Sequence, residues 1–470
     1  MTRFALRTKI SLMLVFLAAA ALHGARDRQA DTRLKDAFRL PQSNGWTFVH
    51  LSGTPPEIGY QHGYLLAPEI LDAQKVIALE LSHDQHHDWR FFREKAQMVL
   101  WPHIESEYRE ELQGIADGVK AHGGTLDLWD IVALNAALEW PYFMKDYNKQ
   151  HGVKDKIAPP GDHCSGFVAT GSYTADGKIV MAQNIWTLYL DGERWTMVFD
   201  IAPARGHHFI MDGFPGLIHS AADWVINDAG IMITETTIQD FHGWDSNGTP
   251  EFVRARKAAQ YASSIDDFAR LMKEGNNGGY ANDWLIGDNK TNEIARLELG
   301  LKHVTLERSS DGYFVGSNFP VNPELAREET GFRLSDLSGS ANARHVRWDQ
   351  LMKENKGRIN LELAKKFLGD HYDTFERKQD ADERTLCGHI DLSPRGSGEW
   401  QPPYGPAGAA QNKATDSAMA RRMAFVGYVG HACGLNFKAS EHLARHPEFN
   451  WQKELLRDLM ARDWTEFAPR

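Results

Sequence analysis

The chain has little cysteine, no runs of positive charge and no long apolar segment. Only three of its 470 residues are cysteine. Its 52 Lys and Arg face 63 Asp and Glu, for a formal net charge of −11, and no basic run interrupts this balance. Nucleic acid and anionic membrane surfaces are therefore not expected partners. Low-complexity segments and internal repeats are also absent, and 42% hydrophobic residues are enough to bury a large core.

The first 25 residues follow the order of a secretory signal peptide. Arg3, Arg7 and Lys9 precede an apolar run from Ile10 to Ala21, and small residues follow it. A run of this length is too short to cross a bilayer comfortably, although an uncleaved anchor stays an alternative. We expect residues 1–25 to be removed and the mature protein to be periplasmic or secreted, with no stable membrane insertion after signal cleavage.

The three cysteines differ in their surroundings. Cys387 and Cys433 lie in similar small, polar settings, so an oxidising compartment favours a disulfide between them. The alternatives are two buried thiols or, with His389 and His431, a Cys₂His₂ zinc site. Cys164 is then left without a partner. It opens an apolar, β-branched run that predicts a strand ending in a turn, a placement typical of a reactive cysteine.

The chain changes character near residue 160. Apolar residues recur at helical spacing from Pro55 to Phe143, and a polar loop from Lys145 to Pro160 then leads to His163 and Cys164. We therefore expect a helical N-terminal part at 31–163 and a catalytic part at 164–470. In the second part the turn 175–177 predicts a hairpin that brings 178–184 against the Cys164 strand.

Further strands and helices are predicted after this hairpin. The strands are expected at 196–201, 208–212, 230–237, 283–287, 293–299 and 313–316, and the helices at 251–261 and 265–274. Strands followed by helices indicate layered sheets covered by helices, which is an α+β fold.

Five motifs occur in order along the chain. They are Gly-Thr-Pro-Pro-Glu-Ile-Gly-Tyr-Gln-His-Gly at 53–63, His-Cys-Ser-Gly-Phe at 163–167, Gln-Asn-Ile-Trp at 183–186, Asn-Asp-Trp-Leu at 282–285 and Gly-Ser-Asn-Phe-Pro at 316–320. Together they resemble the autoproteolytic acyltransferases typified by isopenicillin-N acyltransferase and the related phospholipase B-like proteins, both N-terminal-nucleophile hydrolases. The resemblance implies a four-layer αββα sandwich and a precursor that cuts itself between His163 and Cys164.

The resemblance also implies a reaction. Once Cys164 is an N-terminus, its α-amine (pKa about 7.7–8.0) can take the proton of its thiol (pKa about 8.5), so that no histidine is needed as base. The thiolate then attacks a carbonyl to give a thioester, which water or an amine resolves. No cofactor or metal is implied, and the two fragments are expected to stay associated.

Four other residues are implied to assist Cys164. Asn318 corresponds to a side-chain oxyanion donor in related amidases, and Asn282 is the competing candidate for this role. The backbone near Asn227 corresponds to a second donor. Arg344 corresponds to an arginine that orders the nucleophile, which would also favour the thiolate. An ordinary arginine on a helix surface is the alternative.

Two positions near the nucleophile depart from the amidase pattern. Related amidases carry an aspartate where this chain has Trp186 and an arginine or histidine near Gln183; Asn184 lies between them. How the α-amine is held is therefore open. The expected substrate is a small-molecule acyl amide, the alternatives being a phospholipase B-like lipid hydrolase and a non-catalytic binding protein on the same fold.

Overall fold

The computed structural model describes residues 31–153, 164–221, 224–398 and 400–470. The predicted signal peptide and His163 lie outside the described residues. Within these ranges, no helix is both long and apolar enough to cross a membrane.

Most of the strands form one mixed sheet, here called the large sheet. Over the described residues it contains nine strands, in the order β1 (Phe38–Arg39), β2 (Thr47–Gly53), β5 (Met197–Pro203), β6 (Phe209–Gly213), β7 (Val225–Asn227), β8 (Ile231–Thr237), β9 (Asn282–Asp288), β10 (Glu293–Leu299) and β11 (Val304–Ser309). All neighbours are antiparallel except β2 and β5, which are parallel. The N-terminal part therefore contributes an edge of this sheet.

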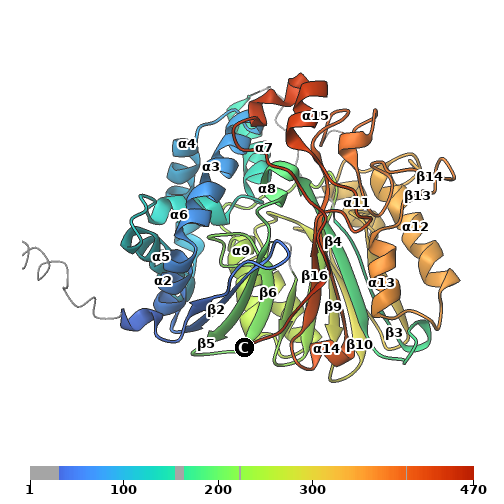
Figure 1. Cartoon of the computed structure of the whole chain (residues 1–470), viewed down its shortest axis with the longest axis horizontal. Coiled ribbons are helices and arrows are strands. Elements are labelled where there is room, and N and C mark those ends of the chain that lie inside the picture. The colour runs from blue at the N-terminus through green and yellow to red at the C-terminus, as the bar shows by residue number, and fades with distance from the viewer. Residues whose placement is uncertain (1–30, 154–163, 222–223, 399) are drawn as a thin grey trace, which may run out of the picture.

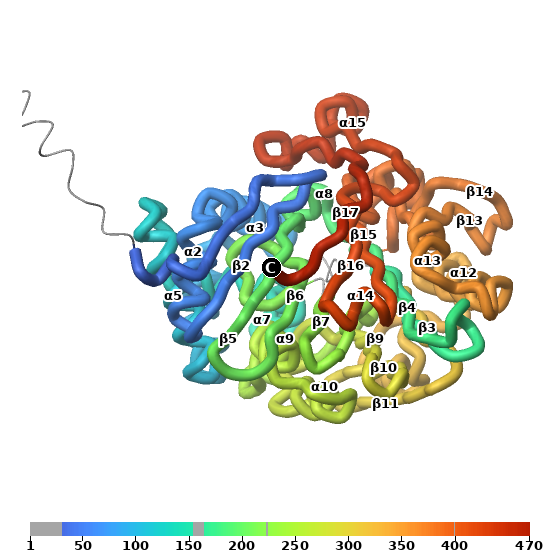
Figure 2. Tube along the Cα trace, turned by 60° about the horizontal axis from the view of Figure 1, so that its bottom comes forward, coloured from blue at the N-terminus to red at the C-terminus, as the bar shows by residue number. Residues whose placement is uncertain are grey.

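A second sheet, here called the small sheet, contains β3, the strand that begins directly after Cys164. Among the described residues its six strands follow the order β12 (Gly312–Gly316), β3 (Ser165–Thr170), β4 (Val180–Leu188), β15 (Ala407–Asp416), β16 (Phe425–Val429) and β17 (Thr465–Phe467), all antiparallel. Figure 2 shows β17 and the C-terminus running close to β2, and the rings of Trp46 and Phe467 lie 5.5 Å apart. A short β13–β14 hairpin (Tyr372–Asp373 and Lys378–Gln379) stands apart from both sheets.

The two sheets face each other and carry helices on their outer faces. Strands β3 and β12 contact β9 and β10 across the interface. The large sheet is covered by α9 (Glu251–Tyr261) and α10 (Ile265–Lys273), and the small sheet by α12 (Ser340–Glu354) and α13 (Leu361–Leu368). Figure 1 shows α12 and α13 on the side away from the N-terminal helices. The α+β fold with a four-layer αββα order is thus confirmed.

The N-terminal part is largely helical, as predicted, and gathers at one end of the large sheet (Figure 1). Its helices are α2 (Pro55–Leu65), α3 (Ala67–Asp84), α4 (Trp89–Lys95), α5 (Ser106–Ala121), α6 (Leu128–Asn135) and α7 (Trp140–His151). Glycines let α2 and α5 touch at the backbone, because a Cβ at Gly59 or Gly63 would lie 2.0 Å from a carbonyl oxygen of α5. The motif at 53–63 therefore has a packing role.

The remaining helices are short and connect the layers. They are α8 (Tyr189–Gly192), α11 (Pro323–Glu329), α14 (Ser417–Ala420) and α15 (Ala439–Arg445). The predicted β3–β4 hairpin and the helices at 251–261 and 265–273 are present. Strand β15 was not predicted. Its sequence is rich in Ala, Gly and polar residues, yet it pairs with both β4 and β16 in the interior of the small sheet.

Candidate functional site

Cys164 lies at the start of strand β3, where several strand ends meet. Its neighbour Ser165 pairs with Asn184 of β4, and Gly166 pairs with Gly316 at the end of β12. Cys164 is fully buried and belongs to the apolar core cluster that also contains Trp195 and Phe214. It forms no disulfide. The nucleophile predicted from the sequence therefore lies at the end of an interior strand, and the residues that follow it pair with two neighbouring strands.

Arg344 of helix α12 holds the backbone of this nucleophile. Its Nη1 donates to the carbonyl oxygen of Cys164 at 2.8 Å and to Oγ of Ser165 at 2.9 Å. Its Nη2 donates to Oδ1 of Asn318 at 2.9 Å, and its Nε to Oγ of Ser340 at 3.1 Å. Of the two readings that the sequence left open, the surface-exposed arginine is excluded, because Arg344 is fully buried.

The charge of Arg344 is unusual for so deep a position. Burial lowers the pKa of Arg344 to about 9, while the electrostatic influence of Cys164 acts in the opposite direction. Among the described residues no carboxylate influences its charge, and its Cζ lies 4.3 Å from the centre of the Trp186 ring. Arg344 is therefore a buried cation that lies beside the backbone of Cys164.

Two asparagines lie at strand ends on the same side of the sheets as Cys164. Asn318 follows β12 with a positive φ of 66°, and its Nδ2 donates to the carbonyl oxygen of Thr237 at 2.7 Å. Asn282 begins β9 and pairs with Thr237 at the end of β8. Both amide atoms of Asn282 are buried and have no hydrogen-bond partner among the residues that the structure describes. Because buried amides are normally bonded, Asn282 has donor and acceptor capacity left for a ligand.

Gln183 and Trp186, the two departures from the amidase pattern, both form hydrogen bonds within the fold. Nε2 of Gln183 donates to the carbonyl oxygen of Glu235 at 2.7 Å, which joins the small sheet to the large one. Nε1 of Trp186 donates to Oδ1 of Asn184 at 3.2 Å, and Nδ2 of Asn184 donates to the carbonyl oxygen of Leu386 at 2.6 Å. These three side chains therefore support the nucleophile strand through uncharged contacts.

Asn227 does not lie near the strand ends around Cys164. It lies in the turn between β7 and β8, whereas the site is at the opposite end of β8, about 20 Å away at the usual rise per strand residue. Its Nδ2 donates to the carbonyl oxygens of Ala259 and Ala262, and its Oδ1 accepts from the backbone N–H of Ile231. Its role is to hold this turn against α9, which corrects the expected oxyanion-binding role.

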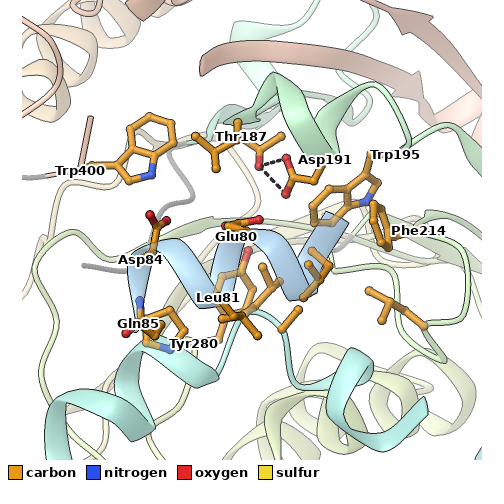
Figure 3. Close-up of a pocket in the computed structure, with 16 residues that line it drawn as sticks. Glu80, Leu81, Asp84, Gln85, Thr187, Asp191, Trp195, Phe214, Tyr280 and Trp400 are labelled. Carbon is orange, nitrogen blue, oxygen red and sulfur yellow. Dashed lines mark hydrogen bonds between the residues drawn. The ribbon is translucent and has the colours of Figure 1, made fainter. Parts of the chain in front are cut away.

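A pocket lies between α3 and the segment at the end of β4. Figure 3 shows aromatic and acidic side chains around it. The lining residues are Ile77, Glu80, Leu81, Asp84, Gln85, Ala137, Leu138, Pro141, Thr187, Leu188, Asp191, Trp195, Phe214, Leu217, Tyr280 and Trp400. Cys164 is not among them, although Trp195, Phe214 and Leu217 belong to the same large apolar core cluster as Cys164.

The polar part of the pocket is acidic. Glu80 and Asp84 of α3 lie across the pocket from Asp191 of α8 (Figure 3). Burial raises the pKa of Asp191 from 3.8 to about 7, against two hydrogen bonds from Oγ1 of Thr187 at 2.9 and 3.0 Å that lower it. The pocket therefore combines apolar walls with three carboxyl groups, a lining that suits an apolar chain and disfavours an anion.

The two remaining cysteines lie side by side but unbonded. Cys387 and Cys433 are free thiols, and Nε2 of His389 lies 3.7 Å from the first sulfur and 3.5 Å from the second. The disulfide expected from the sequence is therefore not formed in this structure. His371, which the sequence reasoning did not consider, joins the same cluster.

Sequence reasoning also missed the supporting residues of the nucleophile and the acidic pocket. Ser340 precedes Arg344 by four residues, a spacing that places both on one helix face and was a usable signal. Ser165 was read only as part of a strand. Asp191 follows Thr187 by four residues, but only the fold reveals that this carboxyl group is buried.

Comparison with known proteins agrees with the resemblance noted in the sequence. A sequence model of the phospholipase B family matches residues 73–300, a range that contains Cys164 and Asn282. The phospholipase B-like 2 protein of Caenorhabditis elegans is 25% identical over 177 residues, which are 35% of this chain and 30% of that protein. The expected similarity to phospholipase B-like proteins is confirmed.

Another relative is similar over more of the chain. An uncharacterized protein of Archaeoglobus fulgidus is 28% identical over 267 residues, 53% of this chain and 42% of that protein. The matches thus span less than half the length of either relative. A solved structure of a mutant conjugated bile acid hydrolase from Clostridium perfringens has 11% sequence identity and a TM-score of 0.31, and covers 56% of this chain and 88% of that one.

The first testable consequence concerns Arg344. We expect Arg344→Lys to destabilise the fold, because one ammonium group cannot replace the fork that serves Cys164, Ser165 and Asn318. Each buried acceptor left unbonded costs about 1–3 kcal/mol, measurable by denaturant unfolding. Arg347→Lys is the matched control, since it lies on the same helix and pairs with Asp370 instead. Equal losses for the two variants would contradict the assigned importance of Arg344.

The second concerns the pH dependence of stability. Because the pKa of Asp191 is raised from 3.8 to about 7 in the folded state, the folded protein holds this proton more tightly than the unfolded chain. The stability from this group is present below pH 3.8 and is lost as pH rises to about 7. Asp191→Asn should therefore gain stability relative to the native chain over this range, by at most about 4 kcal/mol.

Unfolding by urea between pH 4 and pH 8 measures this gain. The exposed Asp176→Asn is the control and should follow the native chain at every pH. A difference between Asp191→Asn and the native chain that stays constant with pH would show that the carboxyl group of Asp191 titrates normally.

Proposed function

We propose that this protein is an exported, self-processing cysteine hydrolase that cleaves or transfers acyl groups of amide substrates through a thioester on Cys164. The observation that carries the proposal is the fork of Arg344, which fixes the carbonyl group of Cys164 and the side chain of Asn318 in one buried network. A fixed cation at a buried cysteine supports a nucleophilic thiolate.

The first step is the cut before Cys164. Its Sγ attacks the carbonyl carbon of His163, the carbon–nitrogen bond breaks, and the nitrogen keeps a proton from the thiol. Water then hydrolyses the thioester, which frees the thiol and leaves His163 with a carboxylate. Because Arg344 holds the backbone of Cys164, the residue that carries the thiol is already positioned before the attack.

The free α-amine then serves as the base for turnover. It accepts the thiol proton, the thiolate attacks the amide carbonyl of the substrate, and the protonated amine returns the proton to the leaving nitrogen. Asn318 and Asn282 are the side-chain donors for the oxyanion, and one such donor is commonly worth about 3 kcal/mol. Within the described part of the chain, neither amide atom of Asn282 forms a hydrogen bond, which supports this assignment.

The pocket indicates the kind of substrate. Its apolar walls suit the acyl chain, and the carboxylates of Glu80 and Asp84 disfavour an anionic leaving group. We therefore assign an amide with an apolar acyl group and a neutral or cationic amine. After the cut, the parallel pairing of β2 with β5 would keep the two fragments together.

Cys164→Ala tests the mechanism. We expect this variant to remain one uncut chain without activity, whereas the native exported protein yields a fragment that begins at Cys164. Intact mass and N-terminal sequencing measure the cut, and fractionation of the producing cells measures export. Cys164→Ser is the companion variant, because a hydroxyl can cut the precursor while attacking substrate poorly. Normal cutting in Cys164→Ala would exclude this mechanism.

A phospholipase B-like lipid hydrolase is the second candidate, favoured by the family match at residues 73–300. The acidic pocket distinguishes the two, because a phosphate would lie against carboxylates. We expect N-acyl amides with neutral or cationic amines to react at least about tenfold faster than anionic ones, equal to about 1.4 kcal/mol. Glu80→Gln should lower the rate ratio between these two kinds of amide, and the exposed Glu94→Gln should leave it unchanged.

The same assay includes phospholipid in mixed micelles. Fatty-acid release from phospholipid, with the amides left intact, would select the second candidate. Absence of any acyl transfer or hydrolysis by fully cut protein would instead favour a binding protein on this fold.

A further inference from the structure

A cluster of metal-binding side chain types lies outside the proposed active site. His371, Cys387, His389 and Cys433 place their potential ligand atoms within 4.8 Å of one another. Cys387 and His389 share one loop, whereas His371 follows α13 and Cys433 follows β16. Three segments that are distant in sequence thus converge on one point in the fold.

The spacing within this cluster fits a shared ion better than a disulfide. Nε2 of His389 lies 3.7 Å from Sγ of Cys387 and 3.5 Å from Sγ of Cys433. In a tetrahedral zinc site with ordinary bond lengths, a sulfur and a nitrogen are about 3.5 Å apart. A disulfide would require the two sulfurs to lie about 2.05 Å apart, and here they are unbonded.

The surroundings also resemble those of a zinc-binding histidine. Cys387 and His389 are fully buried. Nδ1 of His389, the nitrogen not facing the sulfurs, lies 3.8 Å from Oδ1 of Asp391, and the hydroxyl of Tyr189 donates to that same oxygen at 2.8 Å. A carboxylate behind a liganding histidine orients the ring by accepting a hydrogen bond from it. Asp391, which Tyr189 holds, lies next to this position but at 3.8 Å is beyond hydrogen-bond distance in this structure.

We propose that His371, Cys387, His389 and Cys433 form a tetrahedral Cys₂His₂ site for Zn²⁺. Both cysteines bind as thiolates, so that binding releases two thiol protons and changes no oxidation state. The four ligands complete the coordination shell, which makes the site structural rather than catalytic. His371 takes the place that sequence reasoning gave to His431.

The site would brace the wall behind the nucleophile strand. The carbonyl oxygen of Leu386, next to Cys387, accepts from Nδ2 of Asn184 at 2.6 Å and from Nε1 of Trp186 at 3.3 Å. Trp186 in turn lies against Arg344. An ion that ties this loop to residues 371 and 433 would hold these contacts in place. The inference does not depend on the proposed reaction.

Metal content and thiol count of the full-length protein test the site. We expect about one zinc ion per chain by elemental analysis and three reactive thiols in denaturant with chelator, as all cysteines are then free. Chelator-treated protein titrated with Co²⁺ alone should develop the intense visible absorption of tetrahedral cobalt with thiolate ligands, and Zn²⁺ should displace it. One reactive thiol without bound metal would identify a disulfide and overturn the proposal.

Ligand variants complete the test. Cys433→Ser and His371→Ala should each weaken Co²⁺ binding by at least about 10–100-fold, while Cys164→Ser leaves the absorption unchanged. His371 is only partly buried, so its variant is expected to fold, which circular dichroism checks. A cobalt spectrum that is unchanged in both ligand variants, or the weak absorption of octahedral cobalt in the native chain, would also overturn the site.

Discussion

The buried guanidinium of Arg344 is the constraint on which the candidate site depends. It bonds to acceptors from β3, from the loop after β12 and from its own helix, and so it fixes the relative position of Cys164, Asn318 and Ser340. A buried cation is tolerated only where its donors are satisfied. The helix that covers the small sheet, the end of β12 and the start of β3 must therefore be in place together before this group can be buried.

Polar contacts between the sheets keep these strand ends aligned. Gln183 of β4 donates to the backbone of Glu235 in β8, and Lys413 of β15 forms a fully buried ion pair of 2.6 Å with Asp212 of β6. Apolar packing alone would tolerate small slips between two sheet faces, whereas a buried charge without its partner is costly. These pairs restrict the sheets to one register, and this register sets the position of the strand ends around Cys164.

The sequence predicted the parts of the fold that follow from local pattern. The β3–β4 hairpin was predictable because a turn separates two apolar runs, and α9 because its apolar residues recur at helical spacing. Strand β15 was not, since its residues have little intrinsic strand preference and Lys413 is buried only through Asp212. Burial by a distant partner leaves no signal in a local window, and this also explains why Arg344 allowed two readings.

The candidate site shows the same division. Motif order predicted Cys164 and Asn318 as site residues, because each lies in a short, distinctive segment. Asn227 was misjudged, since a motif gives a residue type and a turn but not the end of the strand at which that turn lies. The cluster around His389 needed His371, from a segment well before the Cys387 loop, and only the fold brings the two together. Convergence of distant segments on one point is a property of topology, and it decides here which residues can act on the same atom.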